Sequence, residues 1–174
     1  MLDFTNFKHI HCIGIGGIGL SAIAEIFLSR GYIVSGSDMK QSETTDHLIS
    51  HGAKIYFEHS AENIEGADLI CYSAAVSKEN PELKAAIEQG IPTATRAEAL
   101  GALMSGYENS IAISGTHGKT TTTSMISLIL EHAATDPTIL VGGNLAEFNG
   151  NVKVGKSEYF VTEACEYMDS FLSL

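Results

Sequence analysis

The chain of 174 residues contains 44% hydrophobic and 18% charged side chains and carries a formal net charge of -11. This composition is typical of a globular protein with a substantial core, and the acidic balance excludes general nucleic-acid binding, which needs a basic face. No segment resembles a signal peptide or the roughly 20 apolar residues of a membrane helix, and the three cysteines lack metal-ligand spacing, so we expect a cytoplasmic protein with buried, reduced thiols.

Short apolar runs alternate with helical patterns over the first hundred residues. The first run, at residues 8–13, leads directly into glycines, and apolar residues then repeat at helical spacing as far as Leu28. Alternating strands and helices are typical of a parallel α/β sheet. We therefore expect strands at 8–13, 32–35, 54–57, 67–72 and 91–95, and helices at about 20–28, 42–51, 81–89 and 97–104.

The apolar spacing also predicts which side of two of these helices faces the core. Asn80 and Pro81 begin one of them, because a capping side chain followed by proline is a helix-start signal. In this helix we expect Leu83, Ala86 and Ile87 to point inward. In the helix at 42–51 we expect Leu48 and Ile49 to point inward.

Polar residues and Gly106 interrupt the pattern at 105–109, so we predict one domain at 1–106 and a second at 107–174. The second begins with a strand at 110–114, a glycine turn and a helix at 119–132, and continues with strands at 138–142 and 158–163. A complete nucleotide-binding α/β domain needs more than roughly 100 residues. We therefore expect only the start of such a domain, with apolar surface that is exposed unless two copies self-associate.

The first glycine loop, at 14–19, reads Gly-Ile-Gly-Gly-Ile-Gly and fits G-x-G-x-x-G between a strand and a helix. Gly14 permits the tight turn, Gly16 lets a phosphate approach the backbone, and Gly19 allows close packing of the helix on the sheet. Asp38 follows the second strand at the spacing of an acid that bonds a ribose hydroxyl. The pattern by itself indicates an NAD-dependent oxidoreductase, although the small polar residues at 35–37 suit other contacts.

The second glycine loop, at 115–120, reads Gly-Thr-His-Gly-Lys-Thr and is shorter than the usual phosphate loop, because Ile113 stands where the first glycine is expected. Its backbone N–H groups can cradle phosphates, Lys119 can reach the β- and γ-phosphates, and the Thr120 hydroxyl can bind Mg²⁺. Such a site needs an acid at the end of a neighbouring strand, and Glu163 is the best candidate, with Glu166 in reserve.

Several motifs together resemble the Mur ligases, which are ATP-dependent amide-forming enzymes of peptidoglycan synthesis. Residues 163–167 resemble the acidic segment of the family, whose usual form is Glu-Ala-Asp-Glu-Ser, but Cys165 and Tyr167 depart from that form. The other matching segments are Gly-Thr-His-Gly-Lys-Thr-Thr-Thr-Thr at 115–123, His-Cys-Ile-Gly-Ile-Gly-Gly-Ile-Gly at 11–19, Ser-Gly-Ser-Asp at 35–38, Asn-Pro-Glu-Leu at 80–83, Arg-Ala-Glu at 96–98 and Ser-Phe-Leu at 170–172.

The resemblance implies a Rossmann-like parallel sheet domain followed by the beginning of a P-loop ATPase α/β domain. It implies that UDP-N-acetylmuramate and L-alanine are substrates, that ATP activates the sugar carboxylate as an acyl phosphate, and that these residues alone are catalytically incomplete. The UDP-sugar would contact Gly14, Gly16, Gly17, Ile18, Gly19, Ser37, Asp38 and Ser73. The ATP phosphates would contact Gly115, Thr116, His117, Gly118, Lys119, Thr120 and Thr121. Catalysis would use Lys119, Thr120, His117 and Glu163, with Mg²⁺ on Thr120 and Glu163.

Three alternatives stay open: an NAD-dependent oxidoreductase, a ligase of the same family that recycles murein tripeptide, and a UDP-sugar-binding module without activity. For three side chains, two alternative roles also stay open. His59 is either part of the uridine pocket or structural, His117 either contacts phosphate or holds its loop, and Arg96 either meets an anionic group or pairs with Glu98.

Overall fold

The computed structural model describes residues 2, 4–145, 147 and 150–164. The chain divides into two compact units, Leu2–Ala99 and a second that starts at Leu100. No helix in these described ranges is both long and apolar enough to cross a bilayer. Cys12 and Cys71 are buried and unbridged, whereas Cys165 and the reserve residue Glu166 lie outside the described residues.

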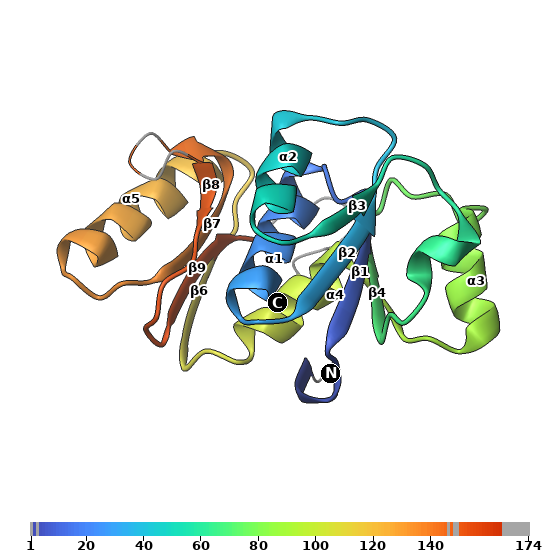
Figure 1. Ribbon diagram of the computed structural model, residues 1–174. Helices are drawn as coiled ribbons and strands as arrows, with labels where there is room; N and C mark the ends of the chain where they lie inside the picture. The colour runs from blue at the N-terminus through green and yellow to red at the C-terminus, as the bar shows by residue number, and fades with distance from the viewer. Residues whose placement is uncertain (1, 3, 146, 148–149, 165–174) are drawn as a thin grey trace. The chain divides into compact units, whose positions relative to one another are not determined.

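The first unit contains one sheet of five parallel strands in the order β3-β2-β1-β4-β5, which confirms the predicted α/β fold class. From β1 the chain continues to β2 and β3 on one side of β1, and then crosses to β4 and β5 on its other side (Figure 1). The order reverses between β1 and β4, and in such sheets ligands bind at the carboxyl ends of the strands at this point. The strands are β1 (His9–Ile13), β2 (Ile33–Ser37), β3 (Lys54–Tyr56), β4 (Leu69–Tyr72) and β5 (Thr93–Thr95).

Helices cover both faces of this sheet, with α1 and α2 on one side and α3 on the other (Figure 1). Local capping explains two of their starts. The Ser42 side chain accepts from Thr45 N in a capping box, and Asn80 accepts from Glu82 N and Leu83 N. The helical elements are η1 (Phe4–Asn6), α1 (Ile18–Ser29), α2 (Glu43–Ser50), η2 (Ala61–Ile64), α3 (Pro81–Gln89) and α4 (Arg96–Met104), and α4 runs across the division between the units.

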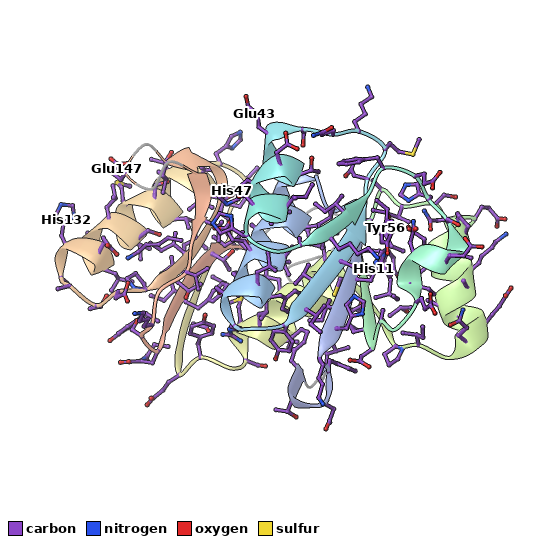
Figure 2. The ribbon with its side chains drawn as sticks, viewed as in Figure 1. His11, Glu43, His47, Tyr56, His132 and Glu147 are labelled. Carbon is purple, nitrogen blue, oxygen red and sulfur yellow. The ribbon has the colours of Figure 1, made fainter. Side chains whose placement is uncertain are left out.

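Strand β1 supplies side chains to both faces of the sheet, because successive residues of a strand point to opposite sides. Ile13 packs with Ile70 and Leu83 in the apolar cluster beneath α3. His11 precedes Ile13 by two residues and therefore points to the same side, toward α3. Figure 2 shows His11 and Tyr56 on this side of the sheet, with ring centroids 6.4 Å apart. A polar group thus lies beside the core on the α3 face.

The prediction that Ile49 and Ile87 point into the core is wrong. Ile49 is 41% exposed and Ile87 is 64% exposed, whereas Leu48, Leu83 and Ala86 are buried as expected. In α3 the buried stripe includes Glu82, which is 0% exposed. Each helical residue advances by about 100°, so a stripe centred between positions 82 and 86 carries position 87 away from the sheet. Because the buried side of α3 includes this acid, apolar spacing alone predicts the wrong side of the helix.

The second unit contains a four-stranded sheet in the order β6-β9-β7-β8. Strands β6, β9 and β7 are parallel, and β8 pairs antiparallel with β7. The sequence analysis missed β8, because Gly-Asn-Val-Lys shows neither alternation nor β-branched enrichment. Figure 1 shows α5 lying along this sheet, and its Met125 and Ile129 side chains are exposed. The elements are β6 (Asn109–Ile113), α5 (Lys119–His132), β7 (Thr138–Leu145), β8 (Gly150–Lys153) and β9 (Tyr159–Glu163).

Gly36 on β2 is required for the close approach of the first glycine loop. A Cβ at this position would lie 2.6 Å from the Cys12 carbonyl oxygen and 2.7 Å from Ile15 Cδ1. We expect Gly36→Ala to destabilise the protein by about 1–3 kcal/mol, the range for overpacking a core, in urea unfolding followed by circular dichroism. Gly106→Ala, whose Cβ would meet only ordinary contacts, is the control. Equal stability of the two variants would contradict this packing argument.

Candidate functional site

A cavity of about 470 Å³ lies at the carboxyl ends of β1, β2 and β4. The residues that follow these three strands, Gly14, Asp38 and Ser73, line it together with His59. The strand order explains this convergence, because β1 lies between β2 and β4. The cavity also includes Met39 and the segment 75–81 that leads into α3. Three predicted contacts for the UDP-sugar therefore meet at one site.

The first glycine loop begins at the end of β1 and ends at the start of α1. Gly14 has a positive φ of 79°, and its N–H donates to the Ser37 carbonyl oxygen at 2.8 Å. The N–H of Gly16 donates to Asp38 Oδ2, also at 2.8 Å. Gly17 is the N-cap of α1 and provides no side-chain cap. The helix terminus thus presents backbone donors and a partial positive charge, which favour an anion.

Arg96 lies against the first turn of α1. A Cβ on Gly19 would be 2.8 Å from Arg96 Cδ and 3.0 Å from Nη1. Glu98 is engaged elsewhere, since its Oε2 accepts from the Thr95 N–H at 2.7 Å and from the Thr95 hydroxyl at 2.8 Å. A guanidinium beside a glycine loop is suited to phosphate oxygens. Of the two readings of Arg96, the geometry therefore favours contact with an anionic group.

Ser37 does not line the cavity. It is 0% exposed, and its hydroxyl donates to Glu82 Oε2 at 2.6 Å. His59 Nδ1 lies 3.0 Å from the same carboxylate oxygen, and Asn63 Nδ2 donates to Glu82 Oε1 at 2.7 Å. Sequence reasoning missed Glu82 and Asn63. The serine acts through this buried network, and His59 is the member of the network that reaches the cavity.

Glu82 is ionised within this network. Burial raises the pKa of its carboxyl, but the His11 imidazole and the hydrogen bonds from Ser37 and Asn63 outweigh burial and lower the pKa to about 2. His11 Nε2 lies 3.6 Å from Glu82 Oε1, beyond hydrogen-bonding distance, so we attribute its effect to charge. A buried carboxylate with hydrogen bonds to both oxygens is thus a fixed feature beside the cavity.

The second glycine loop joins β6 to α5. Gly115 and Gly118 have φ values of 147° and 79°, and Gly118 is the N-cap of α5 without a side-chain cap. Lys119 Nζ donates to the Gly115 carbonyl oxygen, so the lysine folds over its own loop. The other predicted phosphate contacts, Thr116, His117, Thr120 and Thr121, are exposed to solvent. The loop therefore presents accessible backbone and hydroxyl groups around one cation.

Two consecutive glycines on β7 each leave room for one of the predicted metal ligands. Glu163 Oε1 accepts from the Gly142 N–H at 2.8 Å, and a Cβ on Gly142 would lie 3.0 Å from Glu163 Oε2. A Cβ on Gly143 would lie 3.5 Å from Thr120 Cγ2. Within the described ranges, no three His, Cys, Asp or Glu side chains cluster around a metal position. One carboxylate and one hydroxyl suit Mg²⁺, which usually keeps several water or phosphate ligands.

Comparison with protein families gives two matches. Residues 9–108 match the model of the Mur ligase family, catalytic domain, and residues 113–170 match the Mur ligase middle domain. A UDP-N-acetylmuramate–L-alanine ligase of Alkaliphilus metalliredigens is 58% identical over 171 residues, and one of Clostridium tetani is 60% identical over 171 residues. Both alignments cover 98% of this chain, which spans only 37% and 38% of the length of these relatives.

Solved structures agree with the sequence matches. The UDP-N-acetylmuramate-alanine ligase of Thermotoga maritima has a TM-score of 0.82 and 35% identity, over 90% of this chain and 36% of that protein. The UDP-N-acetylmuramate:L-alanyl-gamma-D-glutamyl-meso-diaminopimelate ligase of Neisseria meningitides has a TM-score of 0.84 and 30% identity, over 92% of this chain and 53% of that protein. The fold is thus shared with both kinds of ligase, and the identity is higher to the first.

Glu82 should make part of the stability depend on acid pH. Its pKa is lowered from an ordinary 4.5 to about 2, so the carboxylate stabilises the fold above about pH 4.5, and this contribution is lost as the pH falls toward 2. We expect Glu82→Gln to lower the free energy of unfolding by on the order of 3 kcal/mol at pH 7, and by much less near pH 2. Urea unfolding of both proteins at several pH values measures the difference.

Other acids lose stabilisation over the same pH range, and the comparison must separate them from Glu82. The pKa of Asp68 is lowered by hydrogen bonds from the His9 and Lys8 N–H groups, but wild type and Glu82→Gln share this effect, so it cancels in the difference. Glu88→Gln, an exposed change on the same helix, is the matched control. A wild-type-minus-variant difference that stays constant with pH would show that Glu82 is not ionised as described.

Proposed function

The chain belongs to the Mur ligase family, and we propose that it is part of a UDP-N-acetylmuramate–L-alanine ligase that joins L-alanine to the sugar carboxylate at the expense of ATP. The observation that carries this proposal is the presence of two glycine loops, 14–19 and 115–120, on two separate sheets of one chain. A simple dehydrogenase has no use for the second loop. Identity of 58–60% to relatives of that name supports this ligase over a murein-peptide ligase.

The two units divide the work in this proposal. The first would bind the UDP-sugar and the second would begin the ATP-binding domain. We propose the domain boundary near residue 106, a few residues after the division between the compact units at Leu100. The gap between the two family matches, from residue 108 to 113, supports a boundary close to this position. Because the chain spans less than two fifths of the relatives' length, we propose that ligation requires more of the protein than these residues.

Recognition of UDP-N-acetylmuramate would use the cavity at the carboxyl ends of the strands. The diphosphate would lie at the N-terminus of α1, where Gly16 and Gly17 allow close approach and Arg96 adds positive charge. Asp38 already accepts from the Gly16 N–H. A diphosphate would therefore share or displace this contact, and the nucleoside would occupy the cavity near His59.

ATP would bind at the second loop through its phosphates. Lys119 would leave the Gly115 carbonyl and contact the phosphates, and His117 would extend from the exposed loop toward phosphate or substrate. Thr120 and Glu163 would hold Mg²⁺ beside the glycine pair of β7. When bound, the metal would neutralise charge on the phosphates.

The reaction needs activation, because a carboxylate oxygen is a poor leaving group. In the proposed mechanism the carboxylate oxygen attacks the γ-phosphorus of ATP, the bond to the β-phosphate oxygen breaks, and ADP leaves. The amine of L-alanine then attacks the acyl carbon and loses its proton, and inorganic phosphate leaves. The chain's contribution is to hold the UDP group far from the reacting carboxylate, so that remote binding energy orients it, while Lys119 stabilises the transferring phosphoryl group.

We further propose a cytoplasmic location, which the buried, unbridged Cys12 and Cys71 support. The net charge of -11 favours small anionic ligands held by local backbone groups over nucleic acid. Self-association through the exposed Met125 and Ile129 of α5 stays a proposal, supported by their apolar surface alone.

The choice between UDP-sugar and dinucleotide can be made by calorimetry. We expect UDP-N-acetylmuramate to bind this chain and NADH not to bind. Gly16→Ala should abolish detectable binding, because its Cβ would lie 2.8 Å from Asp38 Oδ2 and would crowd the place where a phosphate approaches. Gly106→Ala, which lies outside this site, should bind as wild type does. Binding of NADH alone would overturn the ligase proposal.

The role of the second loop can be tested by equilibrium dialysis with ATP, with and without Mg²⁺. We expect Lys119→Ala to weaken binding by at least about tenfold, since it removes a charge-assisted contact of about 1.5–3 kcal/mol. Gly142→Ala should weaken binding only when Mg²⁺ is present, because its Cβ would displace the Glu163 carboxylate. Lys156→Ala removes an exposed positive charge from the same unit and is the control. Equal loss in both lysine variants would indicate a general charge effect instead of a phosphate loop.

A further inference from the structure

Glu82 lies behind the cavity wall, in contact with His59, which lines the cavity. The carboxylate is 0% exposed, and the His59 side chain is 22% exposed. The two meet through Nδ1 and Oε2 at 3.0 Å. Glu82 is therefore placed to act on a ligand only through another residue.

The hydrogen bonds fix where His59 carries its proton. An ionised carboxylate only accepts, so the nitrogen that bonds Glu82 must be a donor, and Nδ1 carries a proton. The Ser37 hydroxyl donates to the same Oε2, so its oxygen, 3.0 Å from His59 Nδ1, is also left to accept. In the neutral ring Nε2 is then an acceptor, and it makes no hydrogen bond within the described part of the chain.

A second chain of hydrogen bonds joins His9, Ser35 and His11 beside Glu82. His9 Nδ1 lies 2.9 Å from the Gly66 carbonyl oxygen, and Ser35 Oγ lies 2.7 Å from His9 Nε2 and 2.8 Å from His11 Nδ1. One serine proton cannot serve both nitrogens, so one of the two rings must donate to Ser35. If Ser35 donates to His9 Nε2, then His11 Nδ1 donates to Ser35. If His9 Nε2 donates instead, the serine proton is left for His11 Nδ1. In both cases His11 Nε2 is the nitrogen that faces Glu82 Oε1.

His11 Nε2 is the polar atom that this arrangement leaves unsatisfied. It is buried and has no hydrogen-bond partner in the described ranges, and it lies 3.6 Å from Glu82 Oε1. The His9–Ser35–His11 chain thus approaches the carboxylate at Oε1, whereas His59 bonds Oε2.

We propose that Glu82 is a positioning residue for nucleotide recognition: it keeps the proton of His59 on Nδ1, so that the neutral ring offers Nε2 to the ligand in the cavity as a hydrogen-bond acceptor. The ligand group that fits is an N–H or O–H donor of the nucleoside part of a nucleoside diphosphate. This inference rests on the proposed binding of the UDP-sugar in this cavity.

The other ionisable groups around His59 are consistent with an acceptor site. Asp38 follows β2 and Glu79 precedes α3, and both line the cavity with His59. Glu82 on α3 contacts the ring from behind, and His11 on β1 lies beyond Glu82.

The test is ¹⁵N NMR of the histidine rings in the ligand-free chain, across a pH titration. The His59 signals are assigned by their loss in His59→Gln. We expect Nδ1 to carry the proton of the neutral ring and Nε2 to be the acceptor. In Glu82→Gln the side-chain amide can donate to Nδ1, so the neutral ring should shift toward the Nε2–H tautomer. A wild-type His59 in the Nε2–H form overturns the proposal even if Glu82→Gln fails to fold.

A second measurement connects the tautomer to recognition. We expect Glu82→Gln to bind UDP roughly tenfold more weakly than wild type at pH 8, the scale for losing one hydrogen bond to the ligand. Glu88→Gln, exposed on the same helix, should bind as wild type does. A shifted tautomer with unchanged UDP affinity overturns the recognition role. Failure of wild type to bind UDP overturns the proposed function and the recognition role with it, whereas the tautomer assignment is decided by NMR alone.

Discussion

The order of the five parallel strands is the constraint on which the first unit depends. Because β1 lies at the centre and its two neighbours are reached by crossovers in opposite directions, the segments after β1, β2 and β4 separate at one point. Gly14, Asp38 and Ser73 come from positions far apart in the chain and meet at that point. The glycine loop can fold there only because Gly36 leaves room beside Cys12 and Ile15. The strand order therefore brings these residues together, and the absence of a side chain at Gly36 leaves room for the loop.

An acidic chain can hold acidic ligands here because the attraction is local. The formal charge of -11 is spread over the surface, where water and salt screen it within about 10 Å. Each glycine loop has backbone N–H groups and a cation at the start of a helix, Arg96 beside α1 and Lys119 at the start of α5. At the first loop Asp38 already accepts from one of these N–H groups. Both loops precede a helix whose N-cap provides no side-chain cap. The same arrangement, a glycine loop at an uncapped helix N-terminus, thus occurs next to each of the two sheets.

The sequence predicted the features that depend on local spacing. The loops at 14–19 and 115–120, the strands around them and the cap at Asn80 follow from glycine patterns, alternation and helix-start signals, and the structure contains the corresponding elements. The antiparallel strand β8 was missed because its four residues carry no such signal. Ile87 was assigned to the core because it is apolar, whereas the helix face is decided by contacts with the rest of the unit. The local sequence pattern carries no information about these contacts.

Glu82 shows why the polar part of the site could not be predicted. Its partners Ser37, His59 and Asn63 lie 45, 23 and 19 residues away in the sequence, and none of these separations forms a motif. Replacing a buried charged group by apolar residues of similar volume is often neutral or stabilising, so packing alone does not account for an acid in this core. The first turn of α3 favours its charge, and the carboxylate bonds His59, which lines the cavity. We propose that its position serves the orientation of His59 as well as the stability of the fold.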